Sequence, residues 1–442
     1  MKTLLIIATG AAFSLAGAAL AEGDAAEGEK IFKKCRSCHT IKNGDEVIFK
    51  GGKTGPNLYA VIGRVAGSAD FKFSKSMIAA GEGGLIWTED LIAEFVANPS
   101  AFLKTTMDDS KAKSKMPLKL KKGGADVAAY LASVSPEIGP AWESLPPLAG
   151  GSRQEHPVVA LAGEIYVLAG FNGVPQIVVT VEAYDPVANT WRTNVASIND
   201  GVMDVPMHHA NVAVAGGKIY IVGFLTGNLF APDGRVFEYD PGLNTWTQKT
   251  SMPAGTERGG SQVAAIGNII YVAGGLRGGT VTDFSSYDTV GDTWDTTLPN
   301  LPAPLDHGAA GVVGGTFYVL GGRADGITGL SAAVYAFDPA AATPMWLQKT
   351  DMPTARGGVA GAVLNGLIYV MGGEGNPAGG TGGVFDDNEV YDPANDAWSV
   401  LAPMADPRHG MGAAALVDRI YVPGGGDQQA FGAVDRFDAY VP

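Results

Sequence analysis

Cysteine is scarce in this chain, since Cys35 and Cys38 are the only two among its 442 residues. A framework of structural disulfides is therefore excluded for nearly the whole chain, and the hydrophobic cores must be stable without cross-links. Charged residues are also few, at 17%, whereas glycine occurs 62 times. A chain of this length and composition favours two or three domains with many tight turns and short strands.

Long apolar runs are lacking after the first 21 residues. No later stretch approaches the roughly 18 consecutive apolar residues of a transmembrane helix, so no integral membrane span is expected in the processed protein. The chain begins with Lys2, an apolar run over 4–20 and small residues at 19–21, which is the pattern of a secretory signal. We therefore expect residues 1–21 to be a cleaved signal peptide, with an uncleaved anchor as the alternative.

Positive charge is scarce only in residues 136–442. The net formal charge of the whole chain is −14. Residues 22–135 contain 17 Lys and Arg against 14 Asp and Glu, whereas residues 136–442 contain 13 against 31. The acidic part would repel phosphate groups, so nucleic acid is not expected as a partner.

The two cysteines stand in the run Cys35-Arg36-Ser37-Cys38-His39. Two thiols at this spacing can add to the two vinyl groups of haem, and the adjacent imidazole can bind the iron. A zinc half-site or a redox disulfide would need a second Cys/His cluster or a thioredoxin-like context, and the sequence has neither. The run therefore predicts one covalently attached haem c. Because bacteria attach c-type haem outside the cytoplasm, the haem run and the signal together predict a periplasmic protein.

Further motifs surround this run. Apolar residues at helical spacing predict one helix over 26–34 and another over 124–131. Between them, a Gly-Pro pair predicts a turn at 53–58, and Met116 stands in the run Ser-Lys-Met-Pro.

In this order the motifs resemble the class I cytochromes c, in particular the mitochondrial-type and cytochrome c2 group. The resemblance covers residues 23–134 and implies an all-α domain over residues 22–135. The haem-binding residues that it implies are Cys35 and Cys38 (thioethers), His39 and Met116 (axial ligands), Pro56 (a carbonyl that orients the His39 ring), and Arg64, Trp87 and Ser114 (partners of the propionates). The alternatives are a core role for Met116, simple packing for Trp87 and a surface charge for Arg64.

The sequence departs from the family's common pattern at Phe73 and Phe95, where tyrosine is frequent. Each change removes a hydroxyl near the cofactor, which affects the reduction potential rather than ligation. Because both axial positions would be filled by the protein, the resemblance implies outer-sphere electron transfer. Lysines that flank the haem-bearing segments are expected to dock redox proteins with acidic faces, with an ordinary solvated surface as the alternative; they are Lys33, Lys34, Lys113, Lys115, Lys119, Lys121 and Lys122.

Prolines and a glycine at 136–140 cannot continue a helix, so a short linker is expected there. From residue 141 onward the chain repeats about every 50 residues. Each repeat has an apolar strand with a tyrosine, and these are Tyr166, Tyr220, Tyr271, Tyr318, Tyr369 and Tyr421. Five repeats also have an aromatic-Asp turn before a tryptophan, as in Tyr239-Asp240 to Trp246. The pattern resembles kelch repeats and implies an all-β propeller of six blades over residues 141–442.

The sixth repeat ends at Pro442 without its tryptophan. A matching segment, Ala141-Trp142-Glu143, stands at the start of the repeats. We therefore expect the strand around Trp142 to complete the last blade and to close the ring without free edges.

Histidine is rare in this chain. Five of its six histidines precede the tyrosine strands, and they are His156, His208, His209, His307 and His409. Four arginines stand 13 residues before a tyrosine: Arg153, Arg258, Arg356 and Arg408. At one mouth of the central channel, these side chains could bind an anion, a sugar acid or a metal ion. The alternative, favoured by the regular spacing of the arginines, is that they belong to the repeat and bridge blades.

The favoured interpretation is a periplasmic electron-transfer protein whose propeller docks a partner or binds a small molecule; the sequence identifies no catalytic group. The alternative is a redox enzyme, in which the propeller oxidises a substrate and the fused haem accepts the electrons, or a propeller that isomerises a sugar acid. A radical copper oxidase of the galactose-oxidase kind would need a cysteine cross-linked to tyrosine. Both cysteines are already assigned to haem.

Overall fold

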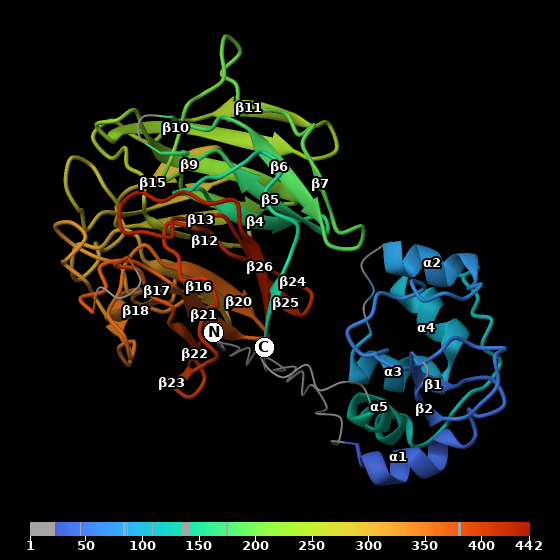
Figure 1. Ribbon diagram of the computed structural model, residues 1–442. Coiled ribbons are helices and arrows are strands. Elements are labelled where there is room, and N and C mark those ends of the chain that lie inside the picture. Colours follow the sequence, from blue (N-terminus) through green and yellow to red (C-terminus); the bar gives the residue numbers. More distant parts are fainter. Residues whose placement is uncertain are drawn as a thin grey trace, which may run out of the picture. The chain divides into compact units, whose positions relative to one another are not determined.

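The computed structural model describes residues 23–442 apart from 45, 83–84, 86, 108, 135–140, 174–175 and 379–381. The expected signal peptide and linker lie outside the described residues. The chain forms two compact units, Met1–Glu137 and Ile138–Pro442 (Figure 1). Among the described residues, no helix is both long enough and apolar enough to cross a lipid bilayer.

The first unit contains helices and one small sheet. The helices are α1 (Ala25–Phe32), α2 (Lys75–Glu82), α3 (Glu89–Ala97), α4 (Pro99–Thr106) and α5 (Gly124–Ser133). The sheet consists of the antiparallel strands β1 (Ile41–Asn43) and β2 (Glu46–Phe49). The expectation of an all-α unit therefore missed this ladder, whose three pairs are too short to show an alternating pattern in the sequence.

The first and last helices of this unit cross where α1 has a glycine. A Cβ on Gly28 would lie 1.9 Å from the Asp126 carbonyl oxygen, so only glycine allows this approach of the two backbones. Next to the crossing, the rings of Phe32 and Tyr130 pack with centroids 5.5 Å apart. The N-terminus of α1 is capped by Asp24, whose carboxylate accepts hydrogen bonds from two amides of the first turn. The crossing of α1 with α5 joins the first and last helices of the unit and fixes the segment that leads into Cys35.

The second unit consists of six four-stranded antiparallel sheets. In the first three, the strands are β4 (Val158–Leu161), β5 (Glu164–Leu168), β6 (Val181–Asp185) and β7 (Thr190–Arg192); β8 (Val212–Ala215), β9 (Lys218–Thr226), β10 (Ala231–Asp240) and β11 (Thr245–Lys249); and β12 (Gln262–Ile266), β13 (Ile269–Ala273), β14 (Phe284–Asp288) and β15 (Thr293–Asp295). In the last three they are β16 (Ala309–Val313), β17 (Thr316–Leu320), β18 (Val334–Phe337) and β19 (Trp346–Gln348); β20 (Ala360–Leu364), β21 (Leu367–Met371), β22 (Asn388–Asp392) and β23 (Ala397–Val400); and β24 (Ala414–Leu416), β25 (Arg419–Pro423), β26 (Phe437–Val441) and β3 (Ala141–Ser144). The unit is thus a six-bladed β-propeller.

The last blade joins the two ends of the propeller. Strand β3, the first of the unit, pairs antiparallel with β26, the last, and Trp142 lies opposite Tyr440. Their ring centroids are 5.1 Å apart, and Tyr440 is fully buried. The seam is therefore held by side-chain packing as well as by the strand ladder.

Each of the six propeller tryptophans donates its indole N–H to a backbone carbonyl that follows the preceding blade. The pairs are Trp142 with Ala402, Trp191 with Pro146, Trp246 with Ala196, Trp294 with Thr250, Trp346 with Pro299 and Trp398 with Thr350, at 2.8–3.2 Å. A partly buried indole N–H needs an acceptor, and here the acceptor comes from the neighbouring blade. The repeated tryptophan therefore acts between blades.

Candidate functional site

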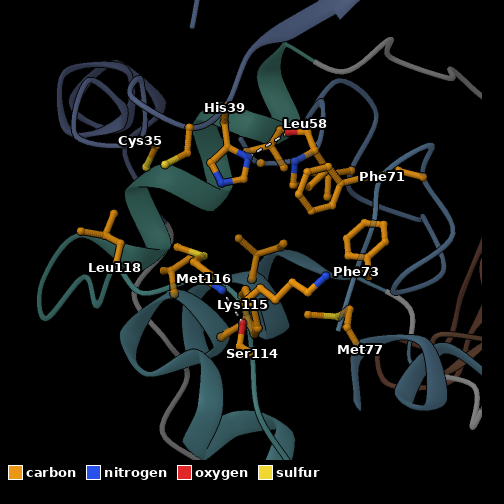
Figure 2. Close-up of a pocket in the computed structure, with 18 of the residues that line it drawn as sticks. Cys35, His39, Leu58, Phe71, Phe73, Met77, Ser114, Lys115, Met116 and Leu118 are labelled. Atoms are coloured by element: carbon orange, nitrogen blue, oxygen red, sulfur yellow. Dashed lines mark hydrogen bonds between the residues drawn. The ribbon is translucent and has the colours of Figure 1, made fainter. Parts of the chain in front are cut away.

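The first unit encloses a cavity of about 450 Å³. It is lined by all eight residues expected to bind haem, namely Cys35, Cys38, His39, Pro56, Arg64, Trp87, Ser114 and Met116. Figure 2 shows the His39 ring and the Met116 side chain directed into this cavity. Its volume lies within the range of about 300–1,000 Å³ that is usual for ligand and cofactor sites.

The His39 ring is held by the Gly-Pro turn. Its Nδ1 lies 2.9 Å from the Pro56 carbonyl oxygen. Because a carbonyl only accepts, Nδ1 carries the hydrogen and the lone pair of the neutral ring is on Nε2. Burial lowers the pKa of His39, which favours this neutral form. The ring is thus oriented and protonated as an iron ligand requires.

Gly55 leaves the space in which this ring stands. A Cβ at Gly55 would lie 2.5 Å from Cε1 and 2.7 Å from Nδ1 of His39. We expect Gly55→Ala to displace the imidazole and to lower the yield of protein with a low-spin haem spectrum. Absorbance spectra of purified protein measure this yield. Gly279→Ala, in the propeller, is the control, because a Cβ at Gly279 would meet no atom within 4 Å and this glycine does not have left-handed backbone. An unchanged spectrum in Gly55→Ala would show that the ring is not confined by this turn.

The two thiols differ in their surroundings. Both cysteines are free, and Cys35 is buried whereas Cys38 is partly exposed. Burial raises the pKa of Cys35 to about 11. A hydrogen bond with Thr54, followed by one with Ser37, lowers the pKa of Cys38. Both side chains line the cavity beside His39, where thioether bonds to a haem would form.

Met116 lies in a loop that two serines fix in place. The Ser114 hydroxyl accepts a hydrogen bond from the Met116 amide at 3.0 Å, and the Ser114 amide donates to the Ser100 hydroxyl on α4 at 3.2 Å. Lys115 donates from Nζ to the Lys72 carbonyl at 2.7 Å. These bonds anchor residues 114–116 of the loop, and Met116 lines the cavity. The role of Ser114 toward a propionate stays a prediction.

Arg64 and Trp87 are neighbours through the backbone, since the Trp87 amide donates to the Arg64 carbonyl at 3.0 Å. The Arg64 guanidinium donates to the Asn57 carbonyl at 3.1 Å, and burial lowers the pKa of this arginine. Trp87 is buried and packs against Phe95 with ring centroids 4.9 Å apart. One wall of the cavity therefore offers two N–H groups suited to carboxylates, and their binding to propionates stays a prediction.

This donor set fits a covalently attached haem. Two free thiols, an imidazole with its lone pair on Nε2 and a methionine thioether line one cavity. Thiols hold the macrocycle, and imidazole with thioether is the axial pair of cytochromes c.

A closed ring of backbone hydrogen bonds lies at the centre of the propeller. Each blade contributes one residue, which stands shortly before β4, β8, β12, β16, β20 or β24. The bonds run from Glu155 N to Gly410 O (2.6 Å), His209 N to Glu155 O (2.9 Å), Gly260 N to His209 O (2.7 Å), His307 N to Gly260 O (3.0 Å), Gly358 N to His307 O (2.9 Å) and Gly410 N to Gly358 O (2.9 Å). Each bond links one blade to the next and the last returns to the first, so the ring encircles the propeller axis.

All six residues of this ring have left-handed backbone, with φ between 51° and 69°. Glycine adopts this conformation freely, and three of the six are glycine. The others are Glu155, His209 and His307, for which a left-handed backbone costs roughly 1–2 kcal/mol each. Three residues with side chains that can bind a ligand thus occupy positions whose left-handed backbone favours glycine. Strained backbone of this kind is common at functional sites.

These three side chains meet several others in a buried cluster, hereafter the ring cluster. Its members are Glu155, His208, His209, Asp306, His307, Arg323, Glu374 and His409. Its contacts are His209 Nε2 to Glu155 Oε2 (3.2 Å), His307 Nε2 to Glu155 Oε2 (3.8 Å), His409 Nδ1 to Glu155 Oε1 (3.7 Å) and to Glu374 Oε1 (3.6 Å), His307 Nδ1 to Asp306 Oδ1 (2.5 Å) and Arg323 to both Asp306 and Glu374. Four of the five histidines predicted at the channel mouth are therefore brought together.

The other residues predicted at the mouth lie elsewhere. His156 is buried and donates from Nε2 to the Pro423 carbonyl at 2.9 Å, and burial lowers its pKa to about 3. The side chains of Arg153, Arg258, Arg356 and Arg408 are fully buried. Their guanidinium groups bind within their own blades, to Glu182, Ser285, Glu389 and Asp438 respectively. Each guanidinium group thus has a partner within its own blade rather than between blades, and its binding of an external ligand stays a prediction.

Four members of the ring cluster were not predicted from the sequence: Glu155, Asp306, Arg323 and Glu374. Each had a detectable signal. Glu155 and Asp306 adjoin the repeat histidines. Arg323 and Glu374 follow the Gly-Gly pair of a tyrosine strand, where the equivalent residues of other repeats, such as Leu276, are apolar. A charged residue in an otherwise apolar column of the repeat would have indicated them.

Comparisons with known proteins agree with both units. The family model described as Kelch motif matches residues 152–193, 257–297 and 355–405. The Kelch-like protein terF of Aspergillus terreus is 36% identical over 305 residues, and the match spans 64% of this chain and 64% of that relative. The solved structure titled "Structure of YjhT" matches 66% of this chain and 95% of its own, with a TM-score of 0.54 at 16% identity, which supports the fold alone.

For the first unit, cytochrome c2 of Rhodobacter capsulatus is 56% identical over 137 residues, which are 30% of this chain and 98% of that protein. Relatives of this kind imply a covalently bound haem c. Its attachment through Cys35 and Cys38, with His39 as an iron ligand, stays a prediction. The chain thus belongs to the cytochrome c2 family over its N-terminal unit and continues as a fused kelch-repeat β-propeller.

Proposed function

We propose that this protein is an exported, periplasmic electron carrier, whose cytochrome unit exchanges one electron at a time and whose propeller docks a partner or binds a ligand. The observation that supports it most is that His39 and Met116 line the same cavity as both thiols. When bound there, haem would supply a one-electron iron couple with no open axial position. His/Met ligation favours the reduced iron and hence a fairly high potential.

The walls of the cavity include aromatic side chains without hydroxyl groups. Phe73 and Phe95 line the cavity at positions where the resemblance leads us to expect tyrosine, and Trp87 packs against Phe102 at a ring separation of 5.9 Å. Fewer hydroxyl groups near the cofactor leave burial and the axial ligands as its main determinants of potential.

Ligand binding to the haem-loaded, full-length protein tests this function. We expect the absorbance spectrum of the ferrous protein to stay unchanged under carbon monoxide, while a redox titration follows a single one-electron curve. Binding of carbon monoxide by the whole sample would show an open iron position. That result would favour a catalytic haem and overturn the electron-carrier proposal.

Seven lysines support a docking face for acidic partners. Lys33, Lys34, Lys113, Lys115, Lys119, Lys121 and Lys122 are all exposed. Two of them, Lys34 and Lys115, also line the cavity. Charge beside the cofactor can steer an anionic partner toward it.

Salt dependence of electron exchange tests this face. With ferricyanide as an anionic oxidant, we expect the second-order rate to fall by about 10-fold between 0.01 and 0.5 M salt, as screening removes the attraction. Lys34→Glu should lower the rate at low salt. Lys104→Glu, an exposed lysine on α4 that does not line the cavity, is the control. Equal rates for the two variants would mean that net charge, rather than a docking face, governs the encounter.

A second function has separate support from the propeller. In it, the propeller would oxidise a small substrate and the cytochrome unit would accept the electrons. The supporting observation is the ring cluster, where Glu155, His209 and His307 occupy strained positions that glycine fills elsewhere. Screening for substrate-dependent reduction of the haem would distinguish this function from simple electron carriage.

A further inference from the structure

Three residues of the hydrogen-bonded ring have side-chain atoms that can bind a metal ion, and these atoms lie close together. The ligand atoms of Glu155, His209 and His307 all lie within 4.8 Å of each other. The side chains of Glu155, His209 and His307 are 9%, 3% and 4% exposed. They come from three different blades, so the closed propeller is what brings them together.

The protonation of His307 is set by its neighbour. Nδ1 lies 2.5 Å from the carboxylate oxygen Oδ1 of Asp306 and donates its hydrogen to it. The lone pair of the neutral ring is therefore on Nε2, which has no hydrogen-bond partner although it is buried. This nitrogen faces Oε2 of Glu155 at 3.8 Å. An imidazole held by a carboxylate in this way is the usual arrangement of a metal-binding histidine.

A relay of hydrogen bonds sets the protonation of His209. His208 Nε2 lies 3.1 Å from the Gly227 carbonyl and must donate to it. His208 Nδ1 then accepts from His209 Nδ1, which lies 2.6 Å away. The lone pair of His209 is therefore on Nε2, 3.2 Å from Oε2 of Glu155.

Two nitrogen lone pairs thus face one carboxylate oxygen, an arrangement that is repulsive unless a positive charge stands among them. Arg323 does not supply it through a direct ion pair, because that arginine pairs with Asp306 and Glu374. In the described part of the chain, every ion pair of Glu155 within 4.0 Å is with a histidine.

We propose that the propeller binds a divalent transition-metal ion through Glu155, His209 and His307. Ligands at about 2.0–2.2 Å from a tetrahedral ion lie roughly 3.3–3.6 Å from one another. The two N···O separations here, 3.2 and 3.8 Å, lie on either side of that range, so small side-chain shifts would bring the atoms to an ion. Two imidazoles and one carboxylate suit zinc, iron, copper or manganese and disfavour calcium and magnesium, which prefer oxygen ligands. A fourth position remains for water or for a small ligand.

The other carboxylate oxygen of Glu155, Oε1, lies near two more side chains that can bind a metal ion, His409 and Glu374. His409 donates from Nε2 to the Gln428 carbonyl at 2.8 Å, which leaves its Nδ1 lone pair free. That Nδ1 is 3.7 Å from Oε1 of Glu155 and 3.6 Å from Oε1 of Glu374. A Cβ at Gly410 would lie 2.4 Å from Oε1 of Glu155, so glycine there leaves room for the carboxylate. Glu155 is therefore the central residue of the site.

Calorimetric titration of the haem-loaded, full-length protein with Zn²⁺, combined with elemental analysis, tests the site. We expect one Zn²⁺ per chain in addition to the haem iron, and no binding of Mg²⁺ under the same conditions. Glu155→Gln and His307→Gln should each weaken Zn²⁺ binding by more than about 100-fold, since loss of even an outer partner costs 10–100-fold. His156→Gln is the matched control, because His156 is a buried propeller histidine outside the cluster. It should bind Zn²⁺ as the unaltered protein does.

Folding of the variants is checked in the same samples by far-ultraviolet circular dichroism. Thermal unfolding provides a second measurement, because Zn²⁺ should raise the propeller's melting temperature only where the ligands are intact. Equal Zn²⁺ affinity in Glu155→Gln, His307→Gln and the unaltered protein would overturn the proposal. So would failure of the unaltered protein to bind Zn²⁺, Co²⁺, Mn²⁺ or Fe²⁺. The haem spectrum reports separately on the cytochrome unit, so neither result would alter the proposed electron transfer.

Discussion

Met116→Leu is expected to leave the haem attached but to abolish the weak long-wavelength absorbance band of sulfur-to-iron ligation. The reduction potential should fall by on the order of 0.2 V, because axial ligands set potentials over a range of about 0.8 V. Attachment should persist since Cys35 and Cys38 are untouched. Optical spectroscopy and a redox titration of the purified protein measure both effects.

Met77→Leu provides the matched control for this prediction. Met77 is the other methionine that lines the cavity, and it is buried on α2. Leucine is similar in volume to methionine, so both variants keep the packing and remove only the thioether. Loss of the band in Met77→Leu with retention in Met116→Leu would exchange the roles of the two residues.

Tyr440→Ala is expected to destabilise the propeller by about 3–5 kcal/mol, the usual cost of removing a large buried aromatic side chain. Tyr440 is fully buried on β26, where it packs against Trp142 of β3 and lies 6.3 Å from Tyr369 in ring centroid separation. The substitution removes side-chain contacts from the seam that closes the ring. Urea unfolding followed by far-ultraviolet circular dichroism measures the loss.

The haem absorbance serves as an internal reference in that experiment. Unfolding of the two units is followed separately, because a single transition cannot be assumed for a two-domain chain. We expect the propeller transition to move and the cytochrome transition to stay. Tyr440→Phe keeps the ring and should behave almost as the unaltered protein does. A loss below about 1 kcal/mol in Tyr440→Ala would mean that the seam contributes little to stability.

Local chemistry accounts for how much of the cytochrome unit could be predicted. Attachment of haem requires two thiols three residues apart and a neighbouring imidazole, so the run from Cys35 to His39 is legible without a fold. The His39 orientation, by contrast, depends on the Pro56 carbonyl and on space left by Gly55. The ladder of β1 and β2 was missed because three paired residues carry no recognisable pattern.

The propeller was predictable for a different reason. The same hydrogen bond recurs from blade to blade, from a tryptophan indole N–H to a carbonyl that follows the preceding blade. Because each blade needs this bond, tryptophan recurs at the same position of each repeat. The same regularity favoured a structural role for the arginines over a ligand-binding ring. Arg258 and Arg356 recur because each binds carbonyls of its own blade. The expected structural role was to bridge blades.

By itself, the sequence determined the cofactor and the repeat architecture, since both depend on residues close together in the chain. Only the tertiary structure decided which histidines meet. His156 and Glu155 are adjacent in sequence, yet Glu155 has left-handed backbone in the central ring whereas His156 faces the Pro423 carbonyl. A shift of one residue thus separates a structural side chain from the ring cluster. The physical reason is ring closure, which brings Glu155, His209 and His307 within reach of a single ion although they belong to three blades.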